Sequence, residues 1–304
     1  MRLTLARGWV PGDVEFVPTE GPVGDPAQLR KYLASVDGAV LDVEPVDGDV
    51  LQEAGSLRVI SRFGVGYDAI SVPALQAGKI SLCNTPGVMA EAVARQALAL
   101  ALALAYRIPE HDRSLKQGRW LRVPNLSVPD AVFGIAGLGA IGSAAARLAS
   151  AIGFRVLAYS RTARPDGIEI VGDLDELIGR SDLVSLHLAL RPETAGIIGW
   201  DRLATMRGKY LINTARGGLV DETAVCRALD EGILAGYATD VFKREPVEGE
   251  SARLAAHPKV VASPHVGAND EATARAMLKR SVLNAVHCLS GEHDRVNAYV
   301  YRAQ

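Results

Sequence analysis

The feature that most constrains this chain is a glycine-rich turn at residues 137–142, GLGAIG. It follows the strand-like run VFGIA and opens the helix-like run SAAARLASAIG. Glycines at this spacing allow a tight turn, close approach of the backbone to a pyrophosphate and close helix–strand packing, with the phosphates at the helix N-terminus. The turn therefore predicts a bound dinucleotide cofactor, with contacts from Gly137, Leu138, Gly139, Ala140, Ile141 and Gly142.

The segment after the next strand-like run, RVLAYS, indicates which dinucleotide binds. Ser160 follows Gly137 by 23 positions, close to the ~20 at which NAD-binding proteins carry an acid for the ribose hydroxyls. That acid is absent, and Ser160 and Arg161 are followed by Thr162 and Arg164. An acid would repel the 2′-phosphate of NADP, whereas a hydroxyl and a guanidinium can bind it. We expect NADP(H) to be preferred and NAD(H) to be possible, although these arginines could instead be solvated surface residues.

Short apolar runs alternate with helix-like segments in two series. The first series holds LTLA, GAVLDV, LRVISRF and KISLC, and the second holds VFGIA, RVLAYS, LVSLHLAL, KYLINTARGG, GYATDVF and KVVASPH. Strands that alternate with helices predict parallel sheets. A length of 304 residues is typical of two domains.

Bulk properties limit the classes of partner. A net charge of −2 gives no electrostatic bias toward nucleic acid or membrane, so we expect neither. The run ALALALALAY, residues 97–106, is much shorter than the ~20 residues of a membrane span, and we expect a buried helix over 89–107. The start of the chain does not resemble a signal peptide, which indicates a cytoplasmic protein. Three widely separated cysteines without ligand spacing predict reduced core thiols and no metal site.

Three strand-like runs of the second series are followed by a polar residue that could carry chemistry. These residues are Arg216 in INTARGG, Glu245 in DVFKREP and His265 in ASPHVGA. Ligands bind at the carboxyl ends of the strands in such sheets. Taken singly, each residue could be structural, with Arg216 and Glu245 in a salt bridge. As an ordered set they favour a catalytic site.

Together with GLGAIG, these segments resemble the D-isomer-specific 2-hydroxyacid dehydrogenase family, which holds glyoxylate/hydroxypyruvate reductases, D-lactate dehydrogenases and D-3-phosphoglycerate dehydrogenases. The resemblance spans nearly the whole chain and includes RFGVGYDAI, NTPGVMAEAV, SLHLALRPET and LINTARGGLVDE. It implies two doubly wound parallel-sheet α/β domains with a cleft between them. These are a flavodoxin-like substrate domain, residues 1–98 and 285–304, and a Rossmann-type cofactor domain, residues 99–284. It also implies a homodimer through the helix at 97–106 and its following loop, unless that helix is intramolecular core.

The resemblance assigns roles to the polar residues. Reduction of a 2-oxoacid needs a cation for the carboxylate, a proton donor and a positioned nicotinamide. Arg216 suits the first task, His265 is the acid/base, and Glu245 would favour the protonated imidazole. The backbone of Gly64, Val65 and Gly66 would hold the substrate carboxylate, and Arg62 could bind a distal anionic group. Further cofactor contacts are implied for His187, Leu188, Thr194, Thr214, Ala215, Arg216, Asp240, His265 and Gly267, with Asp240 accepting from the nicotinamide carboxamide.

One departure from the family's pattern affects the loop HLALRPET, where Ala189 replaces the usual proline and could loosen the loop. The sequence thus predicts an NADP-preferring D-2-hydroxyacid dehydrogenase that reduces a small 2-oxoacid such as glyoxylate or hydroxypyruvate. One alternative is an NAD-dependent oxidoreductase similar to D-3-phosphoglycerate dehydrogenase. The other is a non-catalytic, corepressor-like sensor of dinucleotides.

Overall fold

The computed structural model describes residues 7–10, 14–17, 25–161 and 167–303 of the chain. It divides into two compact units, Met1–Met89 with Asp270–Gln304, and Ala90–Asn269. The family resemblance predicts these divisions at 98 and 284, inside two helices. They fall instead where the helices begin, because α4 (Ala90–Ala105) packs on α6 and α11 (Glu271–Leu289) packs on the first sheet. Each helix therefore belongs wholly to one unit.

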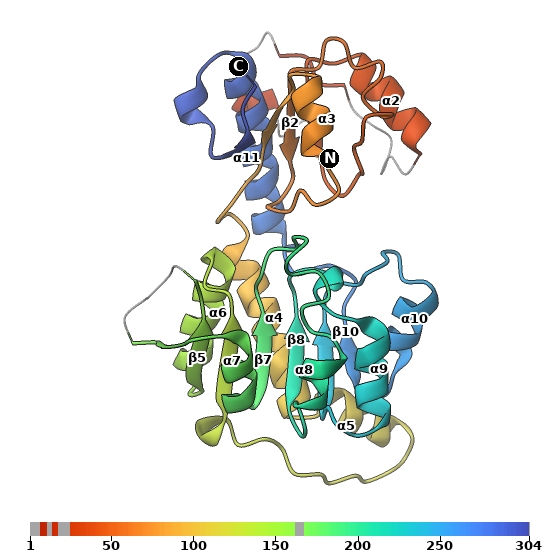
Figure 1. Ribbon diagram of the computed structural model, residues 1–304, viewed down its shortest axis with the longest axis vertical. Coiled ribbons are helices and arrows are strands. Elements are labelled where there is room, and N and C mark those ends of the chain that lie inside the picture. The colour runs from red at the N-terminus through yellow and green to blue at the C-terminus, as the bar shows by residue number, and fades with distance from the viewer. Residues whose placement is uncertain (1–6, 11–13, 18–24, 162–166, 304) are drawn as a thin grey trace. The chain divides into compact units, whose positions relative to one another are not determined.

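The second unit is built on a seven-stranded parallel sheet with the order β10-β9-β8-β7-β4-β5-β6 (Figure 1). Its strands are β4 (Val132–Ala136), β5 (Arg155–Tyr159), β6 (Glu169–Val171), β7 (Leu183–Leu186), β8 (Tyr210–Asn213), β9 (Gly236–Thr239) and β10 (Val260–Ala262). Chain order runs outward from β4 in both directions, so it reverses between β4 and β7. Such a reversal is where a doubly wound sheet binds its ligand.

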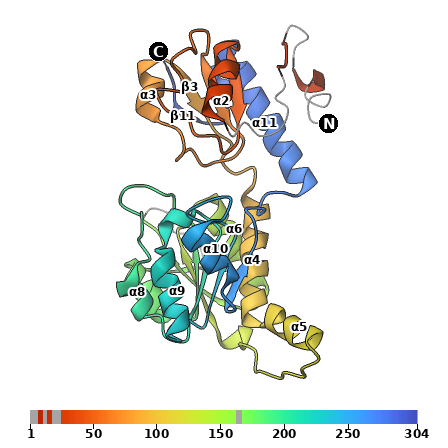
Figure 2. The same ribbon diagram turned by 90° about the vertical axis from the view of Figure 1, so that its right-hand side faces the viewer.

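Helices cover both faces of this sheet because alternate strand residues point to opposite sides. Phe133 and Ile135 pack with α4 and α6, whereas Val132 and Ala136 pack with α7 and α9. Figure 2 shows α4 and α9 on the two sides of the sheet. The helices besides α4 are α5 (Ile108–Lys116), α6 (Ala140–Ala151), α7 (Leu174–Arg180), α8 (Trp200–Ala204), α9 (Glu222–Asp230) and α10 (Gly249–Ala256), with 3₁₀ turns η2 (Val128–Asp130) and η3 (Gly217–Leu219).

The alanine- and leucine-rich run at 97–106 is a buried helix, as predicted, since it lies almost entirely within α4. Leu100 and Leu104 belong to the core between α4, α6 and the sheet. Within the described part of the chain, no helix combines the length and the hydropathy needed to cross a membrane.

The first unit has a four-stranded sheet with the order β1-β2-β3-β11. β1 (Gly38–Leu41), β2 (Val59–Arg62) and β3 (Ser81–Cys83) are parallel, and β11 (Tyr299–Tyr301) adds an antiparallel edge. Ile60 and Leu82 pack with α2 (Pro26–Ala34) and α3 (Val72–Ala77), while Val59 and Cys83 pack on α11. The unit also has 3₁₀ turns η1 (Arg7–Trp9) and η4 (His293–Arg295), and the predicted strand LTLA lies outside the described residues.

Two cysteines that are far apart in the sequence meet in this unit. Cys83, at the end of β3, and Cys288, in the last turn of α11, pack in one cluster and share a side-chain hydrogen bond. That bond, with further bonds from Tyr299 and Ser81, lowers the pKa of the Cys288 thiol against the opposing effect of burial. All three cysteines are free thiols.

Candidate active site

The glycine-rich turn lies between the end of β4 and the start of α6. A Cβ on Gly137, at φ 103°, would lie 2.7 Å from the carbonyl oxygen of His187, and one on Gly142 would lie 1.9 Å from the carbonyl oxygen of Gly137. Contact with neighbouring backbone therefore explains two of the three glycines. A Cβ on Gly139 would meet nothing within 4 Å, so it would enter open space in front of the turn.

This open space fits the phosphates of a dinucleotide. Gly139 is the N-cap of α6, which has neither a side-chain cap nor an acidic residue in its first turn. The unpaired amides and the dipole of a helix N-terminus attract anions. The turn thus offers what a pyrophosphate needs: exposed amides, partial positive charge and a backbone that can be approached closely.

The end of β5 lies next to this turn, as the sequence predicted. The amide of Gly137 donates to the carbonyl oxygen of Tyr159 at 2.8 Å, and Ser160 is the next residue. Arg161 is exposed. Thr162 and Arg164 lie outside the described residues.

The end of β7, across the reversal in strand order, carries His187. Its Nε2 lies 3.0 Å from the Ser185 hydroxyl, and burial lowers the pKa of His187 to about 4, so the ring is neutral. In the loop beyond, the hydroxyl of Thr194 donates to the carbonyl oxygen of Ala189 at 2.7 Å and accepts from the Arg191 amide at 2.8 Å. The loop is therefore closed by Thr194 although Ala189 replaces the family's proline.

A turn after β8 presents Arg216. The side chain of Asn213, the last residue of β8, donates to the carbonyl oxygen of Arg216 at 2.9 Å and accepts from the amide of Ala215 at 3.1 Å. The guanidinium donates to the carbonyl oxygen of Ala215 at 2.8 Å. Thr214 is 7% exposed, and its hydroxyl has no hydrogen-bond partner among the described residues. An orphaned hydroxyl beside the predicted cofactor contacts fits a site that a polar ligand completes.

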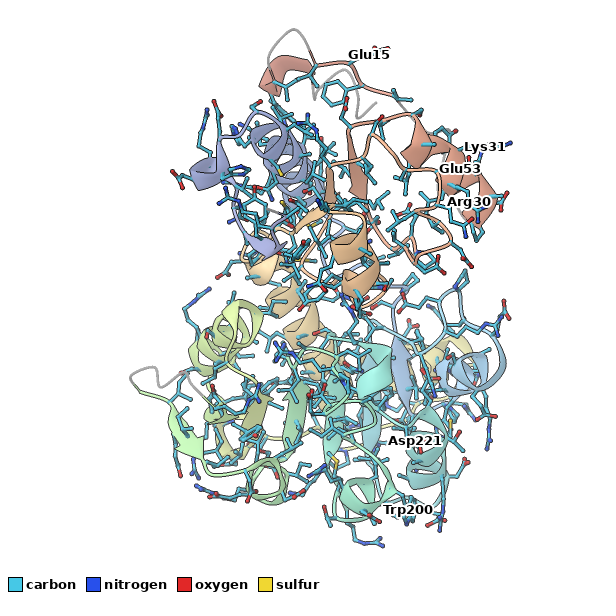
Figure 3. All side chains as sticks on the ribbon, turned by 45° about the horizontal axis from the view of Figure 1, so that its top comes forward. Glu15, Arg30, Lys31, Glu53, Trp200 and Asp221 are labelled. Carbon is cyan, nitrogen blue, oxygen red and sulfur yellow. The ribbon has the colours of Figure 1, made fainter. Side chains whose placement is uncertain are left out.

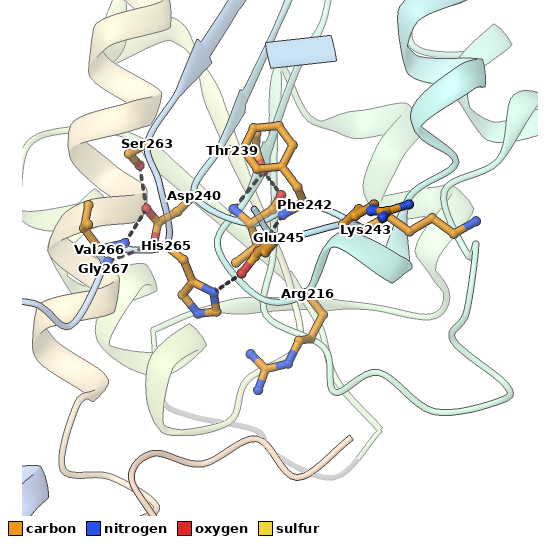
Figure 4. A network of polar contacts seen from close by, with 12 residues as sticks. Arg216, Thr239, Asp240, Phe242, Lys243, Glu245, Ser263, His265, Val266 and Gly267 are labelled. Atoms are coloured by element: carbon orange, nitrogen blue, oxygen red, sulfur yellow. Dashed lines mark hydrogen bonds and ion pairs between the residues drawn. The ribbon is translucent and has the colours of Figure 1, made fainter. Parts of the chain in front are cut away.

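His265 and Glu245 form the centre of the site (Figure 4). The imidazole Nδ1 lies 2.7 Å from Glu245 Oε2, and the Phe242 amide donates to Glu245 Oε1 at 2.8 Å. The hydrogen bond to Glu245 raises the pKa of His265 against the opposing effect of burial. Burial alone would raise the pKa of Glu245, but the bonds from His265 and Phe242 hold it below its usual range. The pair therefore favours a protonated imidazole beside a carboxylate.

Arg216 lies close enough to this pair for its charge to lower the pKa of both members. Figure 4 shows the three side chains gathered at one end of the sheet. The structure thus brings together the three residues that the sequence predicted as catalytic, from turns after β8, β9 and β10.

Asp240 holds the turn that carries His265. It is 2% exposed, and its carboxylate accepts from the Ser263 hydroxyl and from the amides of Val266 and Gly267, at 2.9 and 2.8 Å. Its carbonyl oxygen accepts from the His265 amide at 2.8 Å. These bonds keep His265 in a left-handed conformation, at φ 54°. The sequence suggested a cofactor contact for Asp240 but not this ordering of the turn.

The predicted substrate loop lies in the first unit. Arg62 is 6% exposed, and its Nε donates to the carbonyl oxygen of Gly66 at 3.0 Å. The carbonyl oxygens of Gly64 and Val65 accept from side chains of Thr85 and Asn84 at 3.1 and 2.9 Å. Arg62 is thus a buried residue that supports the loop.

Comparison with known proteins identifies the family. The model of the D-isomer specific 2-hydroxyacid dehydrogenase NAD binding domain matches residues 98–267. This chain belongs to that family. Its members are NAD(P)-dependent oxidoreductases of 2-hydroxy acids, and so is this chain. Among the described residues, no group of three or more His, Cys, Asp or Glu side chains could hold a metal ion.

Individual relatives differ in substrate. The chain is 36% identical over 279 residues to a glyoxylate reductase of Thermococcus litoralis, covering 87% of this chain and 84% of the relative. It is 37% identical to a D-3-phosphoglycerate dehydrogenase of Methanocaldococcus jannaschii, covering 76% of this chain and 45% of the relative. A solved NADPH-dependent glyoxylate/hydroxypyruvate reductase of Sinorhizobium meliloti, in complex with NADP and malonate, superposes with a TM-score of 0.79 at 31% identity, over 88% of this chain and 85% of that one.

Sequence reasoning missed the supports of this dehydrogenase site. Three residues have no role in the proposed reaction, yet each is hydrogen-bonded to a residue or turn of the site. They are Asn213, Glu222 and Ser263. The only signal available was position, since Asn213 and Ser263 lie at or just after strand ends, close to Arg216 and His265.

Proposed function

We propose that this chain is an NADP-preferring D-2-hydroxyacid dehydrogenase that acts mainly as a reductase of a small 2-oxoacid such as glyoxylate or hydroxypyruvate. The observation that carries the proposal is the His265–Glu245 pair, at 2.7 Å, with the charge of Arg216 beside it. A proton donor and a cation for the carboxylate are what this reduction requires of a protein. The glyoxylate reductase relatives support the substrate class.

The chain's own residues would act on the substrate as follows. Because Nδ1 of His265 is bonded to Glu245, Nε2 is the atom left to donate a proton to the substrate carbonyl oxygen. Glu245 keeps the ring protonated, and Arg216 binds the carboxylate and stabilises negative charge that develops on the carbonyl oxygen. When bound, the nicotinamide supplies the hydride.

For the substrate loop we propose that the backbone of Gly64, Val65 and Gly66 binds the carboxylate. The cofactor would be bound by the 137–142 turn, by the 187–194 loop with His187, Leu188 and Thr194, and by the contacts predicted at Thr214, Ala215, Asp240 and Gly267. The open space at Gly139 and the orphaned Thr214 hydroxyl support this assignment.

The cofactor preference is tested by kcat/KM with NADPH and with NADH on glyoxylate and hydroxypyruvate. We expect NADPH to be the better cofactor, and a preference for NADH would contradict the proposal. Changing Ser160→Asp with Arg161→Ala should reduce efficiency with NADPH selectively, because the acid repels the 2′-phosphate. Arg155→Ala, an exposed arginine at the other end of β5, is the matched control. Equal losses with both cofactors would argue against phosphate binding.

A second candidate, an NAD-dependent oxidoreductase similar to D-3-phosphoglycerate dehydrogenase, is favoured by the identity to such relatives. It predicts faster turnover of a phosphorylated hydroxy acid with NAD. A panel of 2-oxoacids and phosphorylated hydroxy acids separates the two. If no member of the panel is turned over while NADPH still binds, a non-catalytic dinucleotide sensor becomes the better description.

We also propose that the protein forms a homodimer. The helix at 97–106 is largely intramolecular core, but large apolar side chains are exposed on α5 and in the loop after it: Ile108 58%, Leu115 57%, Trp120 82% and Leu121 42%. Large exposed apolar side chains that form one patch mark a contact surface, and we propose that these four do so. Light scattering after size exclusion should give twice the chain mass, and Trp120→Glu should shift it toward a monomer.

A further inference from the structure

A buried carboxylate lies behind the acid/base pair and takes no part in the reaction described above. Glu222, the first residue of α9, is 4% exposed. Its Oε1 accepts from the Lys243 amide at 2.7 Å, and its Oε2 accepts from the Ser251 hydroxyl at 2.6 Å. Ser251 Oγ in turn accepts from the Arg244 amide at 3.3 Å. Glu222 thus binds two successive amides of the turn that ends in Glu245, one directly and one through a hydroxyl.

The turn is also packed against the segment that carries Arg216. A Cβ on Gly217 would lie 2.0 Å from the carbonyl carbon of Phe242 and 2.3 Å from the amide nitrogen of Lys243. The Phe242–Lys243 peptide is therefore in contact with Gly217 and hydrogen-bonded to Glu222. The Phe242 amide, which belongs to the peptide just before this one, donates to Glu245 Oε1 at 2.8 Å. Because both peptides share Phe242, the contacts that hold the Phe242–Lys243 peptide also help to place the Glu245 carboxylate.

Helix capping does not explain Glu222. Asp221, labelled in Figure 3, already caps α9, because its carboxylate accepts from the Ala224 amide at 3.1 Å. Burying a charge costs free energy unless its oxygens are hydrogen-bonded. Both Glu222 oxygens are bonded, and both bonds lead to residues 243 and 244.

We propose that Glu222 is a positioning residue for the acid/base pair: its carboxylate, with Ser251, fixes the 242–245 turn so that Glu245 stays within hydrogen-bond distance of His265 Nδ1. The catalytic consequence rests on the proposed function, whereas the effect on His265 itself does not. Arg216, Gly217 and Glu222 lie in one short segment. That segment therefore sets the position of the Arg216 guanidinium and, through the 242–245 turn, that of Glu245.

The test is Glu222→Gln, which keeps size and one acceptor but removes the charge and the acceptor for the Ser251 hydroxyl. NMR titration of the His265 ring, assigned with His265→Asn, should give a pKa below that of the wild type. The charges of Arg216 and Asp240, which also act on His265, remain in place. We expect kcat/KM for reduction to fall roughly 10- to 100-fold, as misplaced catalytic groups cause, with the KM for NADPH unchanged.

Glu248→Gln is the matched control, because Glu248 follows in the same loop but forms an exposed ion pair with Arg244, at 2.9 Å. It should leave both readouts at wild-type values. Ser251→Ala removes only the hydroxyl end of the network and should shift the His265 pKa in the same direction by less; it also decides the matter if Glu222→Gln does not fold.

The proposal is overturned if folded Glu222→Gln and Ser251→Ala both keep the His265 pKa of the wild type. If these variants lose only thermal stability, the role of Glu222 is purely structural. If the wild type reduces no 2-oxoacid, the proposed function fails while the titration still tests the positioning of His265.

Discussion

The two functional regions of the second unit are built in different ways. The proposed cofactor turn at 137–142 is continuous, and its shape follows from one strand, one helix and two glycines in contact with backbone. The proposed acid/base site takes Arg216, Glu245 and His265 from turns after three strands. Buried polar side chains hold those turns. A continuous site depends on local geometry, whereas a discontinuous one depends on residues that never contact the substrate.

The largest expected effect comes from His265→Asn, in the discontinuous region. Loss of the acid/base should lower kcat/KM for reduction by about 10²- to 10⁴-fold, the usual contribution of such a group. NADPH affinity, followed by its fluorescence, should stay within a few-fold of the wild type. His257→Asn is the control. The His257 ring accepts a hydrogen bond from the Lys259 amide, and its replacement should leave kcat/KM near the wild-type value. Unchanged activity in His265→Asn would remove the catalytic assignment.

A pair of glycine variants tests the continuous region. Gly142→Ala should lower the free energy of unfolding by about 3 kcal/mol, because its Cβ would overlap the Gly137 carbonyl oxygen, and overpacking has costs of this order. Gly139→Ala should cost no more than about 1 kcal/mol as a change of N-cap residue, yet weaken NADPH binding. Urea denaturation and cofactor titration measure the two effects. Equal stability of both variants would mean that the turn can relax.

The pH dependence of reduction tests the coupling of Glu245 to His265. The pKa of His265 is raised by Glu245, so kcat/KM should be highest at low pH, where the ring is protonated, and fall as pH rises through that pKa. In Glu245→Gln the pKa returns toward its ordinary value of about 6.5, so the fall should begin at lower pH. The pH profile of kcat/KM on both proteins checks this. If the pH profile is the same in both proteins, Glu245 does not set the pKa of His265.

The smallest expected effect is that of Arg147→Ala, outside both regions. Arg147 pairs with Glu91 at 2.6 Å between α6 and α4, with both side chains about half exposed, 59% and 49%. Exposed pairs contribute about 0–1 kcal/mol. Thermal unfolding should therefore change little and kcat/KM not at all. A large loss of activity would show that the cofactor turn depends on remote contacts as the acid/base site does.

The sequence predicted those helices, strands and candidate site residues that are encoded by a local pattern. The buried helix at 97–106 and most strands of the second unit follow from hydrophobic runs, and Arg216, Glu245 and His265 stand out as polar residues after such runs. β6 was missed because its three residues, Glu-Ile-Val, include an exposed glutamate and leave too short an apolar run to stand out. The unit boundaries were misplaced because hydrophobicity shows that α4 and α11 are buried but not which sheet each one packs on.

The supports of the site were not predictable for a different reason. Glu222 reads as an ordinary acidic residue in the first turn of a helix, where charge favours it. Its partners, the Lys243 amide and Ser251, are more than 20 positions away and only the fold brings them together. The contact between Cys83 and Cys288 was hidden in the same way.

The left-handed backbone at His265, φ 54°, restricts which side chains can follow this strand. Among residues other than glycine, histidine, asparagine and aspartate adopt such a conformation most readily, and of these only histidine titrates near neutral pH. A single change to asparagine is therefore the substitution that the turn accommodates best while proton transfer is lost. A chain with asparagine at this position would keep the backbone of a dehydrogenase and would act only as a binder of its dinucleotide.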